Sequence, residues 1–349
     1  MRTINAYAVR HPGGAAEPFS YQRALGPDDV LVRVTHCSVA RGDVQSIDND
    51  WGDSTFPLVP GHEIVGLVAE AGSAVVDLRA GDRVGIGYQQ AACFSCLFCR
   101  DGLEQLCPEQ KVIGVDCHGG LADYVAVDSR FAFPLPPALD SAKATPLLSA
   151  GLTVYAGIAR AGLRDRSEVA VLGIGGLGCL AIQFLRKMGH RVFAFSHSPA
   201  KKAMIEQLGA EYVDSKKLAG QATLHRRFDL MLSTLNTTFD LNASLRMLTP
   251  QGSLCVVAQP LELLSISIGL LYDNARRSIY GNYVGSRADM MAMLAFAAEH
   301  TVESLVDVLP FTDVNRAIER VRRQNAVART VLHDELASVA AQPKQGIDL

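Results

Sequence analysis

Four cysteines stand close together in the sequence, at a spacing that suits a metal ion. Cys93-x2-Cys96-x2-Cys99-x7-Cys107 offers four thiolates from one short segment, and Zn²⁺ accepts four sulfur ligands in a tetrahedral arrangement. A closed set of four ligands leaves no open position for a substrate, so we predict one structural zinc per chain. A disulfide framework would require an oxidising compartment, and the N-terminus lacks the apolar stretch of an export signal. We therefore expect a cytoplasmic protein.

A glycine-rich segment predicts a dinucleotide cofactor. Residues Gly173-Ile174-Gly175-Gly176-Leu177-Gly178 fit the pattern G-x-G-x-x-G, directly after the apolar run 168–172 and at the start of a second apolar run, 177–188. In such a loop the first glycine makes the turn and the second lets a pyrophosphate approach the backbone. The third glycine packs the helix against the strand, and the helix N-terminus faces the phosphates.

The end of the next apolar run, 191–195, indicates which cofactor this is. An enzyme that uses NAD usually carries an acidic residue here, which binds the ribose 2′-hydroxyl group. This chain instead reads Ser196-His197-Ser198-Pro199-Ala200-Lys201-Lys202, and hydroxyl and ammonium groups suit a 2′-phosphate. We predict NADP(H), bound through Ser196, Ser198 and Lys201. Ser198 and Pro199 also suit the start of a helix, and the two roles are compatible.

The elements that must position these groups fall into two regions. Short apolar runs at 30–35 and 64–69, separated by many glycines and prolines, predict a β-rich first region. From 168 onward, strand and helix patterns alternate as in βαβ units, which build parallel sheets. Further expected elements are strands at 228–232 and 253–258 and helices at 146–161, 288–299 and 312–323.

Length, composition and charge agree with two globular domains. The 349 residues are 48% hydrophobic and 20% charged, with a formal net charge of −3, and one domain typically has roughly 100–150 residues. A near-neutral chain is not a general nucleic-acid binder, so we expect no nucleic-acid partner. No apolar run reaches about 18 residues, so we expect no membrane span.

A third motif, Gly61-His62-Glu63-x2-Gly66-x5-Gly72-x2-Val75, joins the cysteines and the glycine loop. Together the three resemble the zinc-containing medium-chain alcohol dehydrogenases, most closely the cinnamyl-alcohol-dehydrogenase type, over residues 20–335. The resemblance implies an α/β fold with a GroES-like β-rich catalytic domain at 1–147 and 288–349. It implies a Rossmann NADP-binding domain, a doubly wound parallel sheet, at 148–287. It also implies a small-molecule substrate and a homodimer.

The sequence departs from this family at the catalytic zinc. The family's ligands are a Cys, the His-Glu pair and a second Cys. The first position, before Arg41-Gly42-Asp43, holds Ala40, and the second, in Pro146-Leu147-Leu148-Ser149-Ala150-Gly151, holds Ser149. Only His62 and Glu63 remain, whereas a catalytic zinc needs about three protein ligands. We therefore expect the catalytic zinc to be absent.

Two positions near these ligands also lack the side chains that the family uses. The family's proton relay passes through a Ser or Thr hydroxyl and a His, where this chain has Gly42 and Gln45. Cys37 is no replacement ligand, because three residues of strand displace it by roughly 10 Å from Ala40 and turn it to the opposite face. These changes leave the NADP(H) and structural-zinc motifs intact, so we interpret them as altered chemistry.

The resemblance also assigns roles to further positions. Arg41 matches the cation that binds the cofactor pyrophosphate, and Thr153 and Val257 match positions beside the nicotinamide. The candidate catalytic residues are His62, freed from metal and able to titrate, Glu63, which would orient Arg41 or His62, and Tyr88, a pocket position whose phenol could donate a proton. His118 is a weaker donor candidate, and Trp51 would line the pocket with Tyr88. Each of these side chains also has a purely structural interpretation.

Three functions remain open from the sequence. The first is NADPH-dependent reduction of a substrate that carries its own activation, either a C=C bond conjugated to a carbonyl or an iminium ion, because neither needs a Lewis-acidic metal. The second is an ordinary NADP-dependent alcohol or aldehyde dehydrogenase. The third is a non-catalytic NADP(H)-binding protein.

Overall fold

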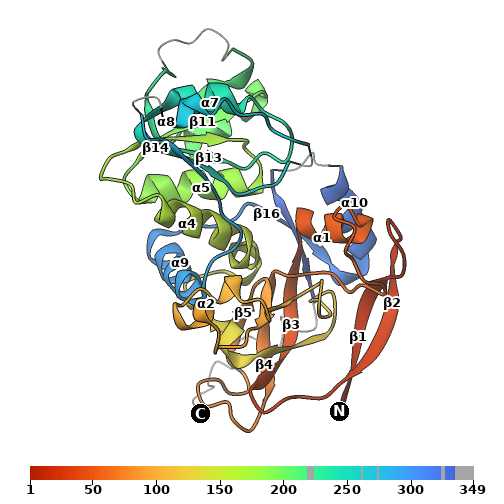
Figure 1. Cartoon of the computed structure of the whole chain (residues 1–349). Helices are drawn as coiled ribbons and strands as arrows, with labels where there is room; N and C mark the ends of the chain where they lie inside the picture. Colours follow the sequence, from red (N-terminus) through yellow and green to blue (C-terminus); the bar gives the residue numbers. More distant parts are fainter. Residues whose placement is uncertain (218–223, 261, 273–274, 324–326, 335–349) are drawn as a thin grey trace, which may run out of the picture. The chain divides into compact units, whose positions relative to one another are not determined.

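The computed structural model describes residues 1–217, 224–260, 262–272, 275–323 and 327–334. The chain forms two compact units (Figure 1). The first unit comprises Met1–Ser149 and Leu305–Leu349, and the second comprises Ala150–Ser304.

The first unit is built mainly from strands. Its seven-stranded sheet has the order β16-β17-β3-β4-β5-β9, with β8 paired to β3, and two-stranded sheets β1-β2 and β6-β7 accompany it. The strands are β1 (Arg2–Val9), β2 (Ala16–Arg23), β3 (Asp29–Val39), β4 (Ile64–Ala71), β5 (Arg83–Ile86), β6 (Gln89–Ala91), β7 (Lys111–Val112), β8 (Tyr124–Asp128), β9 (Ala132–Pro134), β16 (Val306–Pro310) and β17 (Arg329–His333). The helices are α1 (Arg41–Asp48), α2 (Leu97–Arg100), α3 (Ser141–Ala144) and α10 (Val314–Arg322).

Strand β3 is a central strand of the seven-stranded sheet in this unit. It pairs antiparallel with β4, β8 and β17 along different parts of its length, so it is covered on both edges and almost wholly buried. Its run of Val and Leu residues suits such a strand, because β-branched side chains pack well on a pleated surface. Strand β17, from the far end of the chain, therefore lies in the same sheet as β4, which begins two residues after His62.

The second unit is a doubly wound parallel sheet. Its strand order is β12-β11-β10-β13-β14-β15, and every neighbouring pair is parallel, which is the order of classic dinucleotide-binding domains. The strands are β10 (Glu168–Leu172), β11 (Arg191–Ser196), β12 (Glu211–Asp214), β13 (Phe228–Ser233), β14 (Leu248–Val256) and β15 (Ser278–Gly281). The predicted α/β class with a Rossmann sheet is confirmed.

Helices cover both faces of this sheet (Figure 1), with α4, α5 and α9 on one side and α7 and α8 on the other. The helices are α4 (Ala150–Arg160), α5 (Gly176–Lys187), α6 (Lys202–Gln207), α7 (Leu241–Met247), α8 (Gly269–Tyr272) and α9 (Arg287–His300). Because both faces are covered, the strands are continuous apolar runs instead of alternating ones. That is the pattern Val169-Ala170-Val171-Leu172, which is buried throughout.

The structure corrects one expected boundary. The sequence placed residues 288–304 in the first domain, whereas the structure includes them in the second unit. The reason is the packing of α9 on α4, in which the ring of Phe296 lies 6.0 Å from the ring of Tyr155.

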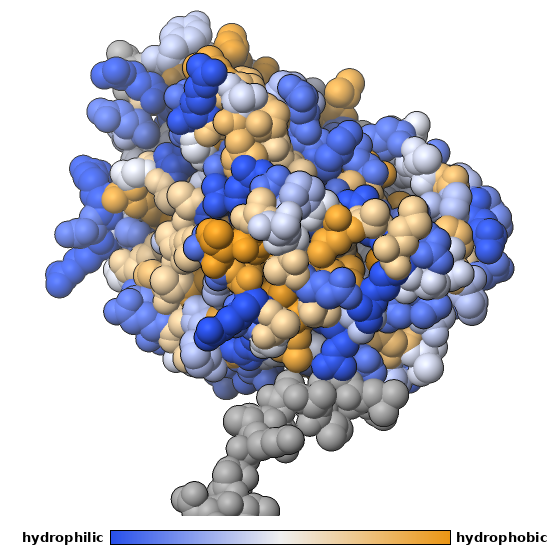
Figure 2. Space-filling model, turned by 90° about the horizontal axis from the view of Figure 1, so that it is seen from below, coloured by the Kyte–Doolittle hydropathy of each residue, from blue (hydrophilic) through white to orange (hydrophobic). Residues whose placement is uncertain are grey.

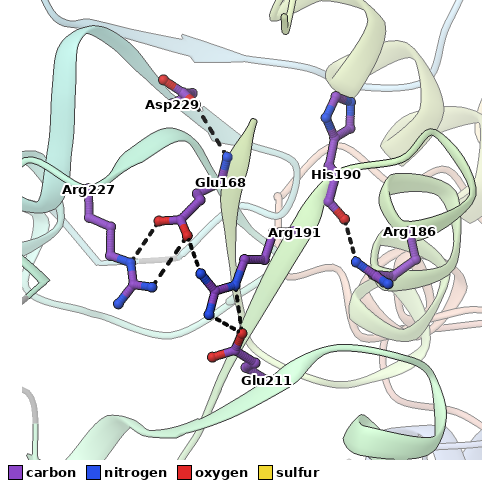
Figure 3. A network of polar contacts seen from close by, with 7 residues as sticks. All are labelled: Glu168, Arg186, His190, Arg191, Glu211, Arg227 and Asp229. Atoms are coloured by element: carbon purple, nitrogen blue, oxygen red, sulfur yellow. Dashed lines mark hydrogen bonds and ion pairs between the residues drawn. The ribbon is translucent and has the colours of Figure 1, made fainter. Parts of the chain in front are cut away.

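A charged network joins the strands of the second unit at their N-terminal ends (Figure 3). Glu168, the first residue of β10, accepts hydrogen bonds from Arg227 Nε and Arg191 Nη1, each 2.8 Å long. Arg191, the first residue of β11, also pairs with Glu211, the first residue of β12. Asp229 accepts a hydrogen bond from the backbone N–H of Glu168. The network therefore links four neighbouring strands through side chains.

Within the described part of the chain, no helix is long and apolar enough to cross a membrane. The face of the molecule seen in Figure 2 shows apolar side chains interspersed with charged ones.

Candidate functional site

The four predicted zinc ligands come together in the first unit. The Sγ atoms of Cys93, Cys96, Cys99 and Cys107 all lie within 4.8 Å of one another, and this is the only group of three or more candidate ligands among the described residues. Cys96 immediately precedes α2, and Cys107 immediately follows a short 3₁₀ helix at Glu104–Leu106. These two local turns bring the four sulfur atoms together.

The geometry of this cluster fits zinc. Tetrahedral Zn–S bonds of about 2.3 Å place sulfurs roughly 3.8 Å apart, and the Cys93 sulfur lies 4.0 Å from that of Cys99 and 3.5 Å from that of Cys107. Hydrogen bonds from Ser95, then from the backbone of Cys96, lower the pKa of the Cys93 thiol to about 6. Burial, then the neighbouring thiols, raise the pKa of the Cys99 thiol to about 12. The support for zinc is therefore the spacing of the four sulfurs.

The glycine loop has the shape that a pyrophosphate requires. Gly173 has φ +85°, and a Cβ atom on Gly178 would lie 2.2 Å from the Gly173 carbonyl oxygen, so the turn and the close packing both exclude a side chain. A Cβ atom on Gly175 would meet nothing within 4 Å, so the space over the loop is open. The helix α5 begins at Gly176 and directs its first N–H groups toward that space.

The residues predicted for the 2′-phosphate gather at the end of β11. Lys201 Nζ donates a 2.7 Å hydrogen bond to the carbonyl of Ile174 within the glycine loop. Ser196 is buried, and its hydroxyl oxygen accepts a 3.2 Å hydrogen bond from the Ser198 N–H. Ser198 and Pro199 do start a 3₁₀ helix, but the Ser198 side chain makes no capping hydrogen bond. The hydroxyl of Ser198 is thus not committed to the helix cap.

Thr153 and Val257, the two positions assigned beside the nicotinamide, both lie in the second unit. Thr153, on α4, is buried, and its hydroxyl accepts a 3.2 Å hydrogen bond from the N–H of Val284. Val257 directly follows β14 and is also buried, with its N–H donating to the Ser233 carbonyl. Both are fixed by the backbone of neighbouring segments.

In the first unit, His62 is held by Asp43. The Nδ1 atom of His62 lies 2.9 Å from Oδ1 of Asp43, whose carboxylate also accepts backbone N–H bonds from Gly61 and Ala40. Gly61 has φ +102°, and a Cβ atom there would lie 2.6 Å from Cys37 Sγ, so only glycine allows this turn. Asp43 was recognised in the sequence as part of the triplet Arg41-Gly42-Asp43, but its hydrogen bond to His62 was not predicted.

The pKa values of His62 and Asp43 are shifted in opposite directions. Burial by itself would lower the pKa of His62, but the charge of Asp43 and its hydrogen bond raise that pKa above 6.5. Burial would raise the pKa of Asp43, yet His62 and the two backbone N–H groups lower it. The pair therefore favours an imidazolium opposite a carboxylate.

The ring of Tyr88 lies against the imidazole of His62. The two ring centroids are 6.1 Å apart and the rings are nearly perpendicular, at 89°. His118 instead packs against Tyr21 and Phe19, with ring centroids at 4.3 and 5.7 Å. That packing supports the structural interpretation of His118. Trp51 is partly exposed on the loop after α1.

Glu63 has partners that the sequence did not indicate. Its Oε2 atom lies 2.6 Å from Arg329 Nη2 and also accepts a hydrogen bond from the Ser38 hydroxyl. The expected partners were Arg41 or His62. Arg329 lies on β17, far away in the sequence, and no local motif marks it, so only strand pairing between β17 and β3 could have revealed it.

The structure describes the positions at which the sequence is expected to depart from the family. Ala40 and Ser149 are both buried. A Cβ atom on Gly42 would meet His62 Cε1 at 3.4 Å, so the relay position faces the imidazole. Cys37 is fully buried, and burial followed by the charges of Asp43 and Glu63 raises the pKa of its thiol.

Arg41 supplies a cation with an unused donor. It is the first residue of α1, and its buried Nε atom has no hydrogen-bond partner among the described residues. A buried guanidinium N–H without a partner is costly, and an anionic ligand would satisfy it.

The chain matches known proteins along most of its length. Residues 26–137 match the family model described as alcohol dehydrogenase GroES-like domain, and residues 176–299 match zinc-binding dehydrogenase. It is 38% identical over 331 residues to the aldehyde reductase AdhA of Synechocystis sp., covering 94% of this chain and 98% of that protein. It is 35% identical to a probable cinnamyl alcohol dehydrogenase of Oryza sativa, with 95% and 96% covered.

The fold of the chain also matches solved structures of other proteins. A cinnamyl alcohol dehydrogenase from Sorghum bicolor has a TM-score of 0.90 and 32% identity, with 99% of this chain and 100% of that chain covered. A cinnamyl alcohol dehydrogenase from Helicobacter pylori, solved with NADP(H), has a TM-score of 0.88 and 26% identity, with 95% and 98% covered.

Proposed function

The chain belongs to the zinc-type medium-chain alcohol dehydrogenase family, and on this premise we propose that it is an NADPH-dependent oxidoreductase that reduces an activated double bond without a catalytic zinc. The observation that carries the proposal is the pair of residues at the family's cysteine-ligand positions. Ala40 has no donor atom, and the Ser149 hydroxyl is not ionised at neutral pH. The remaining side chains, His62 and Glu63, are engaged by Asp43 and Arg329.

Reduction without the metal requires a substrate that is already electrophilic. Zinc contributes several kcal/mol by polarising a carbonyl and holding an alkoxide, and a simple aldehyde or alcohol depends on that contribution. A C=C bond conjugated to a carbonyl accepts hydride at its β carbon and then needs only a proton at the α carbon. When bound, the reduced nicotinamide supplies the hydride.

His62 is the proton donor in this proposal. Asp43 engages Nδ1 and raises the pKa of the imidazole, so that Nε2 carries a proton near neutral pH. That N–H can bond to the substrate carbonyl oxygen and stabilise the enolate that hydride addition forms. Tyr88, edge-on to the imidazole, is the second candidate donor.

Charge pairing favours the conjugated carbonyl over the iminium. The His62 imidazolium is balanced by Asp43, and Arg329 balances Glu63. An iminium ion would place a second positive charge beside the imidazolium, and like charges at short range repel. A neutral carbonyl acceptor avoids this cost.

NADP(H) is the proposed cofactor. Gly173, Gly175, Gly176, Leu177 and Gly178 would receive the pyrophosphate, and Arg41 would neutralise it. Ser196, Ser198 and Lys201 would bind the 2′-phosphate, with Thr153 and Val257 beside the nicotinamide. The open space over Gly175 and the unpartnered Nε of Arg41 support this assignment.

One structural zinc, held by the four-cysteine cluster, completes the proposed composition. We further propose a cytoplasmic homodimer. The thiolate cluster needs a reducing compartment. Among the described residues, strand β15 is the last strand of the six-stranded sheet. The side chains of Leu263, Ile268 and Tyr272, which precede β15 in the chain, are largely exposed. A sheet edge and exposed apolar residues suit pairing with a second copy.

Product analysis tests the proposed reaction. NADPH consumption is measured with an enal, its saturated aldehyde and a cyclic imine, and NADP⁺ reduction with benzyl alcohol. We expect the enal to be reduced at C=C, with little activity on the saturated aldehyde. Efficient alcohol oxidation that chelation abolishes and zinc restores would establish the ordinary dehydrogenase. Cofactor binding without turnover of any substrate would favour the non-catalytic alternative.

A further inference from the structure

The loop that carries the first two cysteines of the zinc cluster contains a strained residue. Phe94 lies between Cys93 and Cys96 in the sequence and has φ +54°, in the left-handed region that bulky side chains seldom adopt. Residues in such a conformation persist where the surrounding structure holds them, and they cluster at functional sites. Both the backbone and the ring of Phe94 make contacts that connect this strain to the zinc cluster.

The backbone of Phe94 acts directly on a predicted zinc ligand. Its N–H group donates a hydrogen bond to the sulfur of Cys99. The N–H of Cys96 donates a 3.3 Å hydrogen bond to the sulfur of Cys93. Groups that hydrogen-bond to metal ligands orient those ligands and tune the affinity for the metal. The conformation of Phe94 therefore sets the direction of one N–H···S bond in the cluster.

The ring of Phe94 is stacked against a cation. The guanidinium carbon of Arg130 lies 3.7 Å from the centroid of the Phe94 ring, well inside the roughly 6 Å over which such pairs attract. The ring of Phe131, which is buried, lies with its centroid 5.8 Å from that of Phe94. Two consecutive residues of the 3₁₀ helix Ser129–Phe131 thus contact the Phe94 side chain.

Arg130 is itself fixed to the seven-stranded sheet. Its Nε and Nη2 atoms donate hydrogen bonds of 2.8 and 2.5 Å to the two carboxylate oxygens of Asp128. Asp128 is buried and ends β8, where it pairs with Asp29 at the start of β3. A bidentate pair fixes the orientation of a guanidinium. A continuous set of contacts therefore runs from the sheet through Arg130 and Phe94 to the sulfur of Cys99.

We propose that Arg130 and Phe94 are positioning residues for the structural zinc. The stack of the guanidinium on the ring holds the Phe94 backbone in its left-handed conformation, and so directs its N–H at Cys99 before zinc binds. A loop that is already ordered loses less conformational entropy on binding, so the stack tightens the hold of the cluster on zinc. This inference rests on the structural zinc proposed above and is independent of the hydride-transfer chemistry.

The affinity for zinc tests this role. Full-length protein is purified under reducing conditions, its zinc content is measured by mass spectrometry, and its zinc dissociation constant is measured in competition with a chelator. Arg130→Gln removes the cation but keeps a donor for Asp128, and Phe94→Leu removes the ring but keeps apolar bulk. Each should raise the dissociation constant about three-fold to ten-fold. Phe94→Tyr keeps the ring and should restore the wild-type value.

A double variant shows whether the two residues act through one contact. If they do, Arg130→Gln/Phe94→Leu should weaken zinc binding no more than the stronger single variant. Arg10→Gln is the matched control, because Arg10 also pairs with a carboxylate, that of Glu17, and also lies over a ring, that of Phe19. This variant should leave the zinc affinity unchanged. Circular dichroism reports that each variant is folded.

The outcomes separate the positioning role from the zinc itself. Purified protein without zinc would overturn the structural zinc, and the positioning role with it. One zinc per chain with the same affinity in Arg130→Gln and Phe94→Leu as in the wild type would overturn only the positioning role. Effects that add fully in the double variant, a Phe94→Tyr variant as weak as Phe94→Leu, or an equal loss of affinity in Arg10→Gln would overturn it as well.

Discussion

Arg329 Nη2 lies 2.6 Å from Oε2 of Glu63, although the two residues are 266 positions apart in the sequence. Their side chains are only 12% and 1% exposed. The pair joins β17 to the residue that precedes β4, immediately after His62. The guanidinium of Arg329 therefore holds the buried Glu63 side chain in position.

Removing Arg329 should therefore destabilise the protein. Arg329→Ala removes the guanidinium that pairs with the buried Glu63 carboxylate, and breaking a buried ion pair from one side costs about 3–5 kcal/mol. Urea unfolding followed by circular dichroism measures this loss. The control is Arg316→Ala, which breaks the exposed pair with Asp313 and should cost at most about 0.5 kcal/mol. Equal stability of the two variants would contradict the role given to Arg329.

Metal content distinguishes the two zinc sites of the family. Purified protein should contain one zinc per chain, because only the cysteine cluster offers a complete ligand set among the described residues. The double variant Ala40→Cys/Ser149→Cys restores the missing thiolates and should raise the content to about two zinc ions. Mass spectrometry of the metal measures both values, with Ala40→Cys alone as the control. A wild-type content of two, lowered to one by His62→Ala, would show that the zinc-free interpretation is wrong.

The pH dependence of reduction should follow His62. Its raised folded-state pKa keeps the imidazole protonated at low pH, so enal reduction should fall as pH rises through that pKa. Asp43→Asn removes the charge that raises the pKa and leaves burial, which lowers it. The falling limb of the kcat profile should then move to lower pH. An unchanged limb in Asp43→Asn would remove His62 from the proton-donor role.

Lys201 should determine cofactor preference. A hydrogen bond to a charged group contributes about 1.5–3 kcal/mol, so Lys201→Ala should weaken NADPH binding about ten-fold or more. NADH, which lacks the 2′-phosphate, should bind the variant as it binds the wild type. Titration calorimetry measures both affinities. Lys202→Ala, which removes an exposed neighbour paired with Glu206, is the control and should change neither.

The network at Glu168 should make stability depend on pH. Hydrogen bonds from Arg227 lower the pKa of Glu168 despite its partial burial. A carboxyl with a lowered folded-state pKa contributes stability above its unfolded pKa and loses it as pH falls through the folded value. Glu168→Gln should therefore cost about 1 kcal/mol at pH 7, and the difference should vanish in strong acid. Thermal unfolding at several pH values measures it, and a constant difference would exclude this origin.

The sequence by itself determined the features that rest on local signals. The run 168–172 coincides with β10, and the glycine loop follows it because a tight turn, a close approach and a helix start are all encoded within six neighbouring residues. The four cysteines assemble for the same reason, since short turns bring near neighbours together. The predicted loss of zinc ligands at Ala40 and Ser149 also came from local signals, because each residue lies inside a recognisable local motif.

Tertiary structure alone decided what joins distant segments. The pairing of Glu63 with Arg329, the hydrogen bond between Asp43 and His62, and the inclusion of α9 in the second unit all depend on contacts across long sequence separations. Periodicity and motifs report which face of an element is buried, but not which partner it meets. That choice follows from the pairing of β17 with β3 and the packing of α9 on α4, which depend on the whole fold.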